Sequence, residues 1–240
     1  MRVHFLGSGD AFGSGGRNQT AYLLEDRSHL YLLDCGPSTL PALRRARLDP
    51  ANLDAVILSH LHGDHFGGLP FFFIHYLYDQ PRTRPLQIAG PPGTEERVRA
   101  LMELMYGKKE LPFAVFSELQ LDTVTAVAGA EVLAFRVPHQ TDAVSLGLKV
   151  TAAGRTVLFS GDSSWTDQFV THSRGADLFI CECCYYDDTS ASHMSYVQIA
   201  ANRDRLHCKR LILTHMGEEM LARRPSLPVR TAEDGLVVDL

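Results

Sequence analysis

The 240-residue chain lacks the features of several special classes of protein. No run of 18 apolar residues is present, which excludes a transmembrane helix. The opening MRVHFLGSGD lacks the apolar core of a signal peptide. There is also no internal repeat, low-complexity tract or charged tail. We therefore expect a globular protein that does not act in a membrane.

Cysteine is scarce and unevenly distributed. Of the five cysteines, three lie in the single segment CECC at 181–184, and no matching cluster occurs elsewhere. An odd count in this arrangement is not a disulfide framework. The expected location is therefore the cytoplasm, where thiols stay reduced. We interpret Cys181, Cys183 and Cys184 as small buried apolar residues.

Positive charge is also limited. The chain has 23 Lys and Arg against 28 Asp and Glu, a formal net charge of −5. This balance disfavours a protein whose main role is to coat nucleic acid. The apolar fraction of 45% and charged fraction of 21% are ordinary for a soluble protein. We expect one domain over 1–240, long enough to bury a core without staples.

Short apolar runs separated by turn signals dominate the chain. The expected strands are 2–6, 20–25, 30–34, 55–59, 86–89, 131–137, 145–150, 156–160, 177–181 and 211–214. Helical patterns with capped starts or polar faces are found at 39–47, 94–106 and 192–206. This order predicts a mixed β-sheet core with helices outside it.

The segment AVILSHLHGDHFGG, at 55–68, carries the strongest chemical signal. Four ligand-type side chains follow its apolar strand: His60, His62, Asp64 and His65. Alternation along an extended chain lets His60 and His62 face one metal. Gly63 permits a sharp turn, after which Asp64 and His65 point to an adjacent position. Imidazole and carboxylate suit zinc and also manganese or iron.

Three further ligand-type residues follow predicted strands: His139, Asp162 and His215. A single histidine after a strand is usually a hydrogen-bonded loop residue. Three such positions beside the 60–65 segment favour a shared site instead. Together they make seven candidate ligands, enough for two metals about 3.5–4 Å apart.

The motifs FLGSG, LLDCG, HLHGDH, PH, SGD and LTH occur in this order between Phe5 and His215. In this order they resemble the metallo-β-lactamase superfamily. The resemblance implies an α/β (α+β) fold, an αββα sandwich of two mixed β-sheets flanked by helices, with metals at one edge of the sheets. It also implies two divalent ions, with Zn²⁺ favoured over Mn²⁺ or Fe²⁺. The implied ligands are His60, His62 and His139 for one metal, Asp64, His65 and His215 for the other, and Asp162 bridging.

Two positions narrow the branch of the superfamily. Oxygen-reducing diiron members carry Glu in place of His62, and dizinc β-lactamases carry Cys in place of Asp162. The opening FLGSGDAFGSGGRNQTAYLL resembles that of ribonuclease Z-like proteins instead. In those enzymes a His at the position of His193 faces the scissile phosphate, and a Glu at the position of Glu182 orients it.

These assignments predict catalytic roles for three residues. His193 would stabilise charge on the phosphate and supply a proton to the leaving group, held by Glu182. Asp64, with Asp162, would accept the proton of the attacking water. Asp34, in LLDCG, would accept a hydrogen bond from a metal-binding histidine. Arg17 and Asn18 are weaker candidates for substrate contact.

The chain departs from ribonuclease Z in two places. His215 is followed by MGEEML, and the segment 100–125 is too short for a long tRNA-binding arm. The sequence therefore predicts a dinuclear metal-dependent hydrolase, a phosphodiesterase resembling ribonuclease Z, acting on a small phosphodiester or RNA. The alternatives are hydrolysis of a carboxylic, sulfate or lactone ester and a non-catalytic metal-binding protein. We also expect a homodimer, formed through the aromatic segment after the 60–65 motif.

Overall fold

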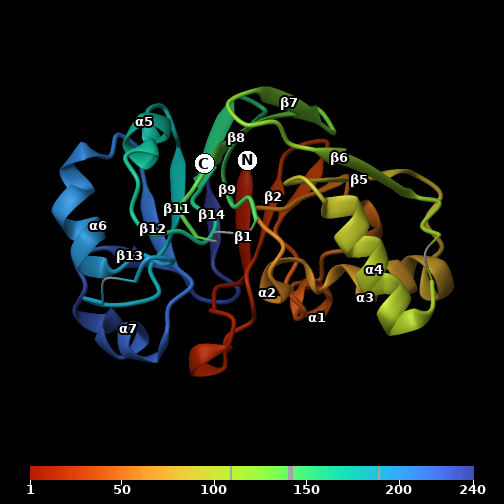
Figure 1. The fold of residues 1–240 in the computed structure, drawn as a ribbon, viewed down its shortest axis with the longest axis horizontal. Helices are drawn as coiled ribbons and strands as arrows, with labels where there is room; N and C mark the ends of the chain where they lie inside the picture. Colours follow the sequence, from red (N-terminus) through yellow and green to blue (C-terminus); the bar gives the residue numbers. More distant parts are fainter. Residues whose placement is uncertain (109, 140–142, 189) are drawn as a thin grey trace.

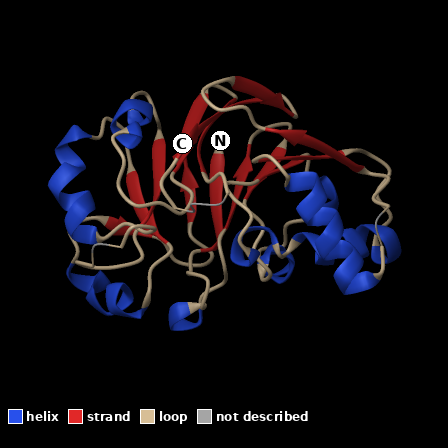
Figure 2. Ribbon diagram, viewed as in Figure 1, coloured by secondary structure: helices blue, strands red, loops and turns tan. Residues whose placement is uncertain are grey.

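A computed structural model describes residues 1–108, 110–139, 143–188 and 190–240. Within these residues, two seven-stranded mixed sheets pack face to face, and helices cover their outer faces (Figures 1 and 2). The predicted αββα sandwich is therefore confirmed.

The first sheet has the strand order β14-β1-β2-β3-β4-β5-β6. Its strands are β14 (Val237–Asp239), β1 (Arg2–Gly7), β2 (Ala21–Glu25), β3 (Leu30–Leu33), β4 (Ala55–Ile57), β5 (Leu86–Gly90) and β6 (Ala114–Glu118). Pairing is antiparallel from β14 to β3 and parallel from β3 to β6. The helices on this side are α1 (Thr39–Arg45), α2 (Gly63–Phe66), α3 (Leu69–Ile74), a π-helix (His75–Asp79) and α4 (Thr94–Tyr106).

The second sheet has the strand order β13-β12-β11-β10-β9-β8-β7. Its strands are β7 (Val124–Val127), β8 (Ala130–Arg136), β9 (Leu146–Ala152), β10 (Arg155–Phe159), β11 (Leu178–Glu182), β12 (Leu211–Thr214) and β13 (Arg230–Thr231). β10 to β13 pair in parallel, and β7 to β10 pair antiparallel. The helices on this side are α5 (Gln168–Ser173), α6 (Tyr196–Asn202) and α7 (Glu218–Arg223).

Alternation along the strands divides the core into layers. In β2, Tyr22 and Leu24 face the second sheet, whereas Ala21 and Leu23 face the helices. Tyr22 packs edge-on against Phe159 of β10, with ring centroids 5.2 Å apart. The two sheets therefore hold each other through a continuous apolar layer, and the loops at their shared edge are fixed in space.

The structure corrects two predicted boundaries near the candidate ligands. The strand predicted over 55–59 ends at Ile57. The helix predicted from 192 begins at Tyr196, because Ser195 and Gln198 form a capping box that starts the helix there. His193 therefore lies in the loop before α6. The strands β6, β7, β13 and β14 were not predicted.

Candidate metal centre

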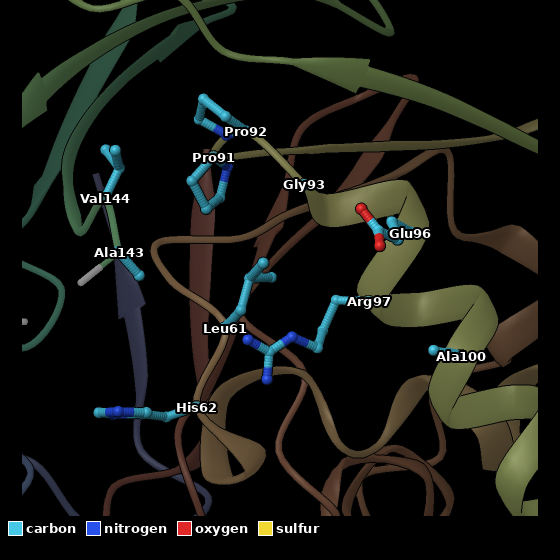
Figure 3. A pocket seen from close by; sticks show the side chains of 10 residues that line it. All are labelled: Leu61, His62, Pro91, Pro92, Gly93, Glu96, Arg97, Ala100, Ala143 and Val144. Carbon is cyan, nitrogen blue, oxygen red and sulfur yellow. The ribbon is translucent and has the colours of Figure 1, made fainter.

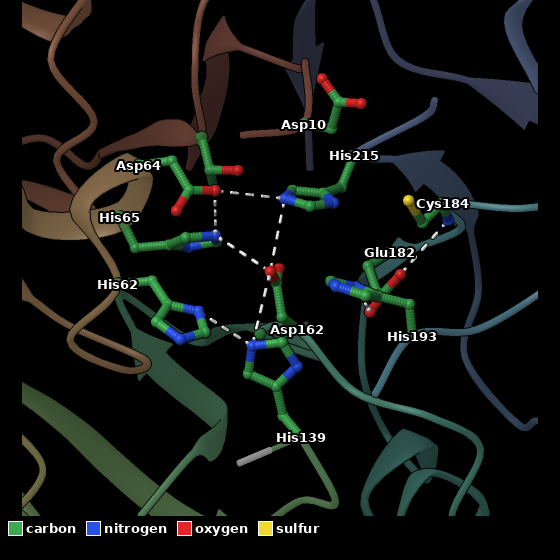
Figure 4. Close-up of polar contacts among 12 residues, drawn as sticks. Asp10, His62, Asp64, His65, His139, Asp162, Glu182, Cys184, His193 and His215 are labelled. Carbon is green, nitrogen blue, oxygen red and sulfur yellow. Dashed lines mark hydrogen bonds and ion pairs between the residues drawn. The ribbon is translucent and has the colours of Figure 1, made fainter. Parts of the chain in front are cut away.

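The loop after β4 carries the first four candidate ligands. The chain leaves the strand at Ile57, and His62 is the N-cap of α2 with extended backbone angles. Nε2 of His60 consequently lies 3.1 Å from Nδ1 of His62. The first turn of α2 then presents Asp64 and His65 on the neighbouring side (Figure 4).

The second sheet supplies the other three. His139, Asp162 and His215 each follow the carboxyl end of a strand, β8, β10 and β12 respectively. β10 and β12 run in the same direction. β8 also runs in this direction, because it pairs antiparallel with β9, which in turn pairs antiparallel with β10. Carboxyl ends of strands that run the same way meet at one edge of a sheet. That edge faces the loop after β4 (Figure 4).

The seven side chains form two groups. In the first, ligand atoms of His60, His62 and His139 lie within 4.8 Å of one another. Nε2 of His139 is 3.1 Å from Nδ1 of His62. Asp64, His65, Asp162 and His215 make the second group by the same criterion. The structure thus brings together all seven residues, in the grouping expected from the sequence.

Asp162 joins the two groups. Its Oδ2 atom approaches four imidazoles: 3.3 Å from Nε2 of His65, 3.4 Å from that of His215, 3.9 Å from that of His60 and 4.0 Å from that of His139. A single carboxylate oxygen therefore lies between both sets of nitrogens, the position of a bridging ligand.

The donor atoms fit divalent metals. Nε2 of His65 and Nε2 of His215 are buried and complete no hydrogen bond within the described residues. Oδ2 of Asp64 lies 3.2 Å from Nε2 of His65 and 3.5 Å from Nε2 of His215. Buried polar atoms usually have a partner, and a cation among imidazole nitrogens and carboxylate oxygens would supply it.

Electrostatics keeps the carboxylates ionised. Burial raises the pKa of the Asp162 carboxyl, but the charges of His215 and His65 outweigh burial and hold it well below its usual range. Burial also raises the pKa of Asp64, and its contacts with His215 and His65 reverse the sign, so the net pKa is lowered.

The imidazoles divide into two electrostatic classes. Burial lowers the pKa of His60 far below its ordinary value, which leaves its lone pair free for a metal. For His65, burial also lowers the pKa, but the carboxylates of Asp162 and Asp34 raise it well above the ordinary value. The same opposition of burial and carboxylates raises the pKa of His215. This second position therefore attracts positive charge.

Hydrogen bonds behind the imidazoles set their orientation. Nδ1 of His65 donates to Oδ2 of Asp34 at 2.7 Å, and Asp34 also accepts from the backbone and hydroxyl of Ser59. Nδ1 of His139 donates to the carbonyl of Ser192 at 2.7 Å. Each bond directs the other ring nitrogen toward the centre. Asp34 thus makes the contact expected from the sequence.

Glu182 and His193 form a pair beside the cluster. Glu182 ends β11, is fully buried, and accepts at Oε1 from Nδ1 of His193 at 2.9 Å. Backbone amides of Ser163 and Cys184 also donate to this carboxylate, which fixes it. The His193 ring stacks on His215, with centroids 5.6 Å apart. Burial lowers the pKa of His193, but the hydrogen bond with Glu182 outweighs it and the pKa is raised.

Two sequence interpretations receive no support. Arg17 donates to Ser8 and to the carbonyl of Ala232, and Asn18 donates to the carbonyl of Leu6. Arg17 thus ties the Gly-rich loop to the C-terminal segment, and the Asn18 side chain is held by Leu6 and by Arg45, which donates to its Oδ1. Conversely, the sequence did not single out Arg97, which lines a pocket that reaches His62. A lone charge on an amphipathic helix gives no signal of that kind.

The comparison with known families assigns the chain. The beta-lactamase superfamily domain matches residues 29–216. The match covers most of the chain, so the protein belongs to this family. Metal binding by divalent ions is a property that this fold family implies, and the His and Asp cluster is placed to provide it.

Individual relatives narrow the branch. The chain is 27% identical to a ribonuclease Z of Methanosarcina acetivorans, covering 90% of this chain and 87% of that protein. It is 28% identical to the probable metallo-hydrolase YhfI of Bacillus subtilis, with the same coverage. The structure superposes on human tRNase Z, short form, with a TM-score of 0.80 and 28% identity, over 100% of this chain and 99% of the other.

These relatives confirm the predicted superfamily and its ribonuclease Z-like branch, and they support the predicted hydrolase. Within the described part of the chain, no helix combines the length and apolar character needed to cross a membrane.

Proposed function

We propose that this protein is a dinuclear metal-dependent phosphodiesterase. The observation that carries the proposal is the Asp162 carboxylate between two groups of imidazoles, with the Glu182–His193 pair directly beside it. His60, His62 and His139 would hold one ion, Asp64, His65 and His215 the other, and Asp162 both. Zn²⁺ suits this nitrogen-rich set, with Mn²⁺ or Fe²⁺ as alternatives.

Bound divalent ions would polarise the phosphoryl oxygens and activate a water molecule. The other steps belong to side chains of this chain. Asp64 is ionised and partly exposed, so it can accept a hydrogen bond from the attacking water and orient it. His193, whose pKa is raised, can donate a proton to the leaving oxygen, and Glu182 holds its ring in position.

A phosphodiester suits this arrangement better than a carboxylic ester. Cleavage of a phosphodiester with an alkoxide leaving group needs an acid on the side opposite the attacking water, and the buried carboxylate behind His193 keeps that acid charged. The relatives named ribonuclease Z and tRNase Z point to the same bond type. Only residues 107–113 separate α4 from β6, which favours a small phosphodiester or RNA over whole tRNA.

The test uses metal-stripped protein reloaded with Zn²⁺ or Mn²⁺. We expect metal-dependent hydrolysis of a dinucleotide and of bis(p-nitrophenyl) phosphate. His193→Ala should slow dinucleotide cleavage by about 10²-fold or more, the usual contribution of a general acid. The substitution should slow hydrolysis of bis(p-nitrophenyl) phosphate less, because nitrophenolate leaves without a proton. His207→Ala, at an exposed histidine outside the site, is the control.

These assays test the role of His193 and the type of ester separately. Equal losses on both substrates would reject His193 as the proton donor. No turnover with either metal, despite two bound ions per chain, would reject the phosphodiesterase and favour hydrolysis of another ester.

A single domain over 1–240, a homodimer and a cytoplasmic location stay predictions.

A further inference from the structure

A pocket opens beside the candidate metal centre (Figure 3). Its volume is about 680 Å³, within the usual range for small-molecule sites. Three parts of the chain form it: the loop after β4, the turn Pro91–Gly93 with the first turns of α4, and the segment before β9. His62, a candidate ligand of the first metal, is one of its lining residues. A molecule bound at the metals can therefore extend directly into this pocket.

About half of the pocket wall is apolar. Leu61, Pro91, Pro92 and Val144 supply this surface. Such a surface suits a sugar or a base rather than a chain of solvated charges. The pocket thus fits the organic part of a phosphodiester on one side of the scissile phosphorus.

Arg97 is the cation in this wall. Its side chain extends from α4 toward Leu61 (Figure 3). Among the described residues, no hydrogen bond or ion pair engages its guanidinium. Arg99, two residues further along the same helix, differs: it donates to Glu95 at 2.8 Å and lies over the ring of Phe116.

The negative charge around Arg97 limits its attraction for an anion to short range. Glu96 lines the same pocket, and the whole chain carries a net charge of −5. No broad positive field is therefore available to attract an anion. Binding of an anionic group would depend on direct contact with the guanidinium, whose planar fork matches phosphate oxygens.

We propose that this pocket binds the nucleoside next to the scissile phosphate and that Arg97 binds a second phosphate on that nucleoside. The substrate class is then a phosphodiester with another phosphate one nucleoside away, as in an oligonucleotide or a bisphosphorylated nucleotide. The proposal rests on the phosphodiesterase function proposed above.

A matched pair of substrates tests this. Thymidine 5′-(p-nitrophenyl phosphate) and its 3′-phosphorylated form share the leaving group and the nucleoside and differ only in the second phosphate. The metal-loaded protein should have a kcat/KM about tenfold higher for the 3′-phosphorylated form, as a charge-assisted contact at a solvent-exposed arginine provides. Equal kcat/KM values would overturn the proposal.

Variants at two arginines of α4 locate the effect. Arg97→Gln should remove the tenfold preference, so that the ratio of kcat/KM for the two substrates falls to about one. Arg97→Lys should restore part of it, because the charge stays while the fork is lost. Arg99→Gln is the control and should keep the preference. A preference that survives Arg97→Gln would exclude Arg97 as its source.

A binding measurement separates this proposal from the proposed function. Calorimetric titration of the zinc-loaded protein with thymidine 3′,5′-bisphosphate needs no turnover. Arg97→Gln should raise Kd about tenfold relative to wild type and to Arg99→Gln. Such a rise without hydrolysis of any substrate would support the pocket and reject the phosphodiesterase. An unchanged Kd together with active hydrolysis would reject the role of Arg97 but not the phosphodiesterase function.

Discussion

The two sheets contribute to the candidate metal centre in different ways. The first sheet supplies four ligand-type residues from one loop, within the six positions from 60 to 65. The second sheet supplies His139, Asp162 and His215 from the ends of three strands, together with Glu182 from a fourth. In the loop, chain connectivity alone keeps the ligands together. In the second sheet, only the common direction and register of the strands do so.

The difference shows where each half is vulnerable. The loop depends on a few polar contacts from behind, above all those of Asp34. The strand ends depend on the sheet, in which the parallel pairs β10–β11 and β11–β12 set Asp162, Glu182 and His215 beside one another. The following changes break or sharpen this comparison.

The largest effect should come from Asp162→Asn, which breaks the contact between the halves. Asn has no charge to place between the two groups of imidazoles. We expect loss of at least one metal ion per chain and a fall in activity on the order of 10³-fold. Metal analysis by mass spectrometry and hydrolysis assays measure both. Asp167→Asn, an exposed acid paired with Arg205, is the control. Full metal content and activity in Asp162→Asn would contradict the bridging role.

Asp34→Asn tests the support of the loop and should have an intermediate effect. An amide cannot accept from Nδ1 of His65 and from Ser59 with the strength of a carboxylate. Residues that orient metal ligands typically contribute 10–100-fold in affinity, so we expect zinc affinity to fall by about that factor. Competition with a chromogenic chelator measures it. An unchanged zinc Kd would show that the loop backbone alone positions His65.

The smallest effect should come from a substitution at Asp177, at the opposite end of β11 from Glu182. Asp177 precedes the strand and Glu182 ends it. Burial raises the pKa of Asp177, but hydrogen bonds from Lys209 and the Thr156 backbone outweigh it and lower the pKa to about 2. A lowered folded-state pKa contributes stability above the ordinary value of 3.8 and loses it as pH falls through about 2.

Asp177→Asn should therefore destabilise the protein by ~1 kcal/mol at pH 7 and leave activity unchanged. The difference in stability from wild type should shrink between about pH 4 and pH 2. Urea unfolding of the two proteins across this pH range measures it. A constant difference at all pH values would show that packing, rather than charge, explains the loss.

Much of the site was predictable because local patterns mark it. HLHGDH brings four ligand-type residues together by connectivity, and alternation along strands such as β2 marks buried faces. The boundaries were less predictable. The start of α6 depends on the reciprocal hydrogen bonds of Ser195 and Gln198. The strand predicted over 55–59 ends early, and the backbone N–H of Ser59 donates to the side chain of Asp34 instead.

Edge strands escaped prediction for a different reason. β6 and β7 carry exposed side chains and acquire their extended form by pairing with a neighbouring strand. Their own composition therefore holds little signal. Arg97 was missed likewise, since its place in the pocket depends on Leu61 and Val144, which are distant in sequence.

The sequence by itself determined the fold class, the family resemblance and the seven candidate ligands, because each rests on residue types, on local spacing and on the order of short motifs along the chain. Tertiary structure decided the distances from one oxygen of Asp162 to both groups and from Glu182 to His193, which the family resemblance only implied. It alone revealed that a pocket with Arg97 adjoins His62. Those facts are distances between residues far apart in the chain. Sheet packing sets such distances, and no local pattern encodes them.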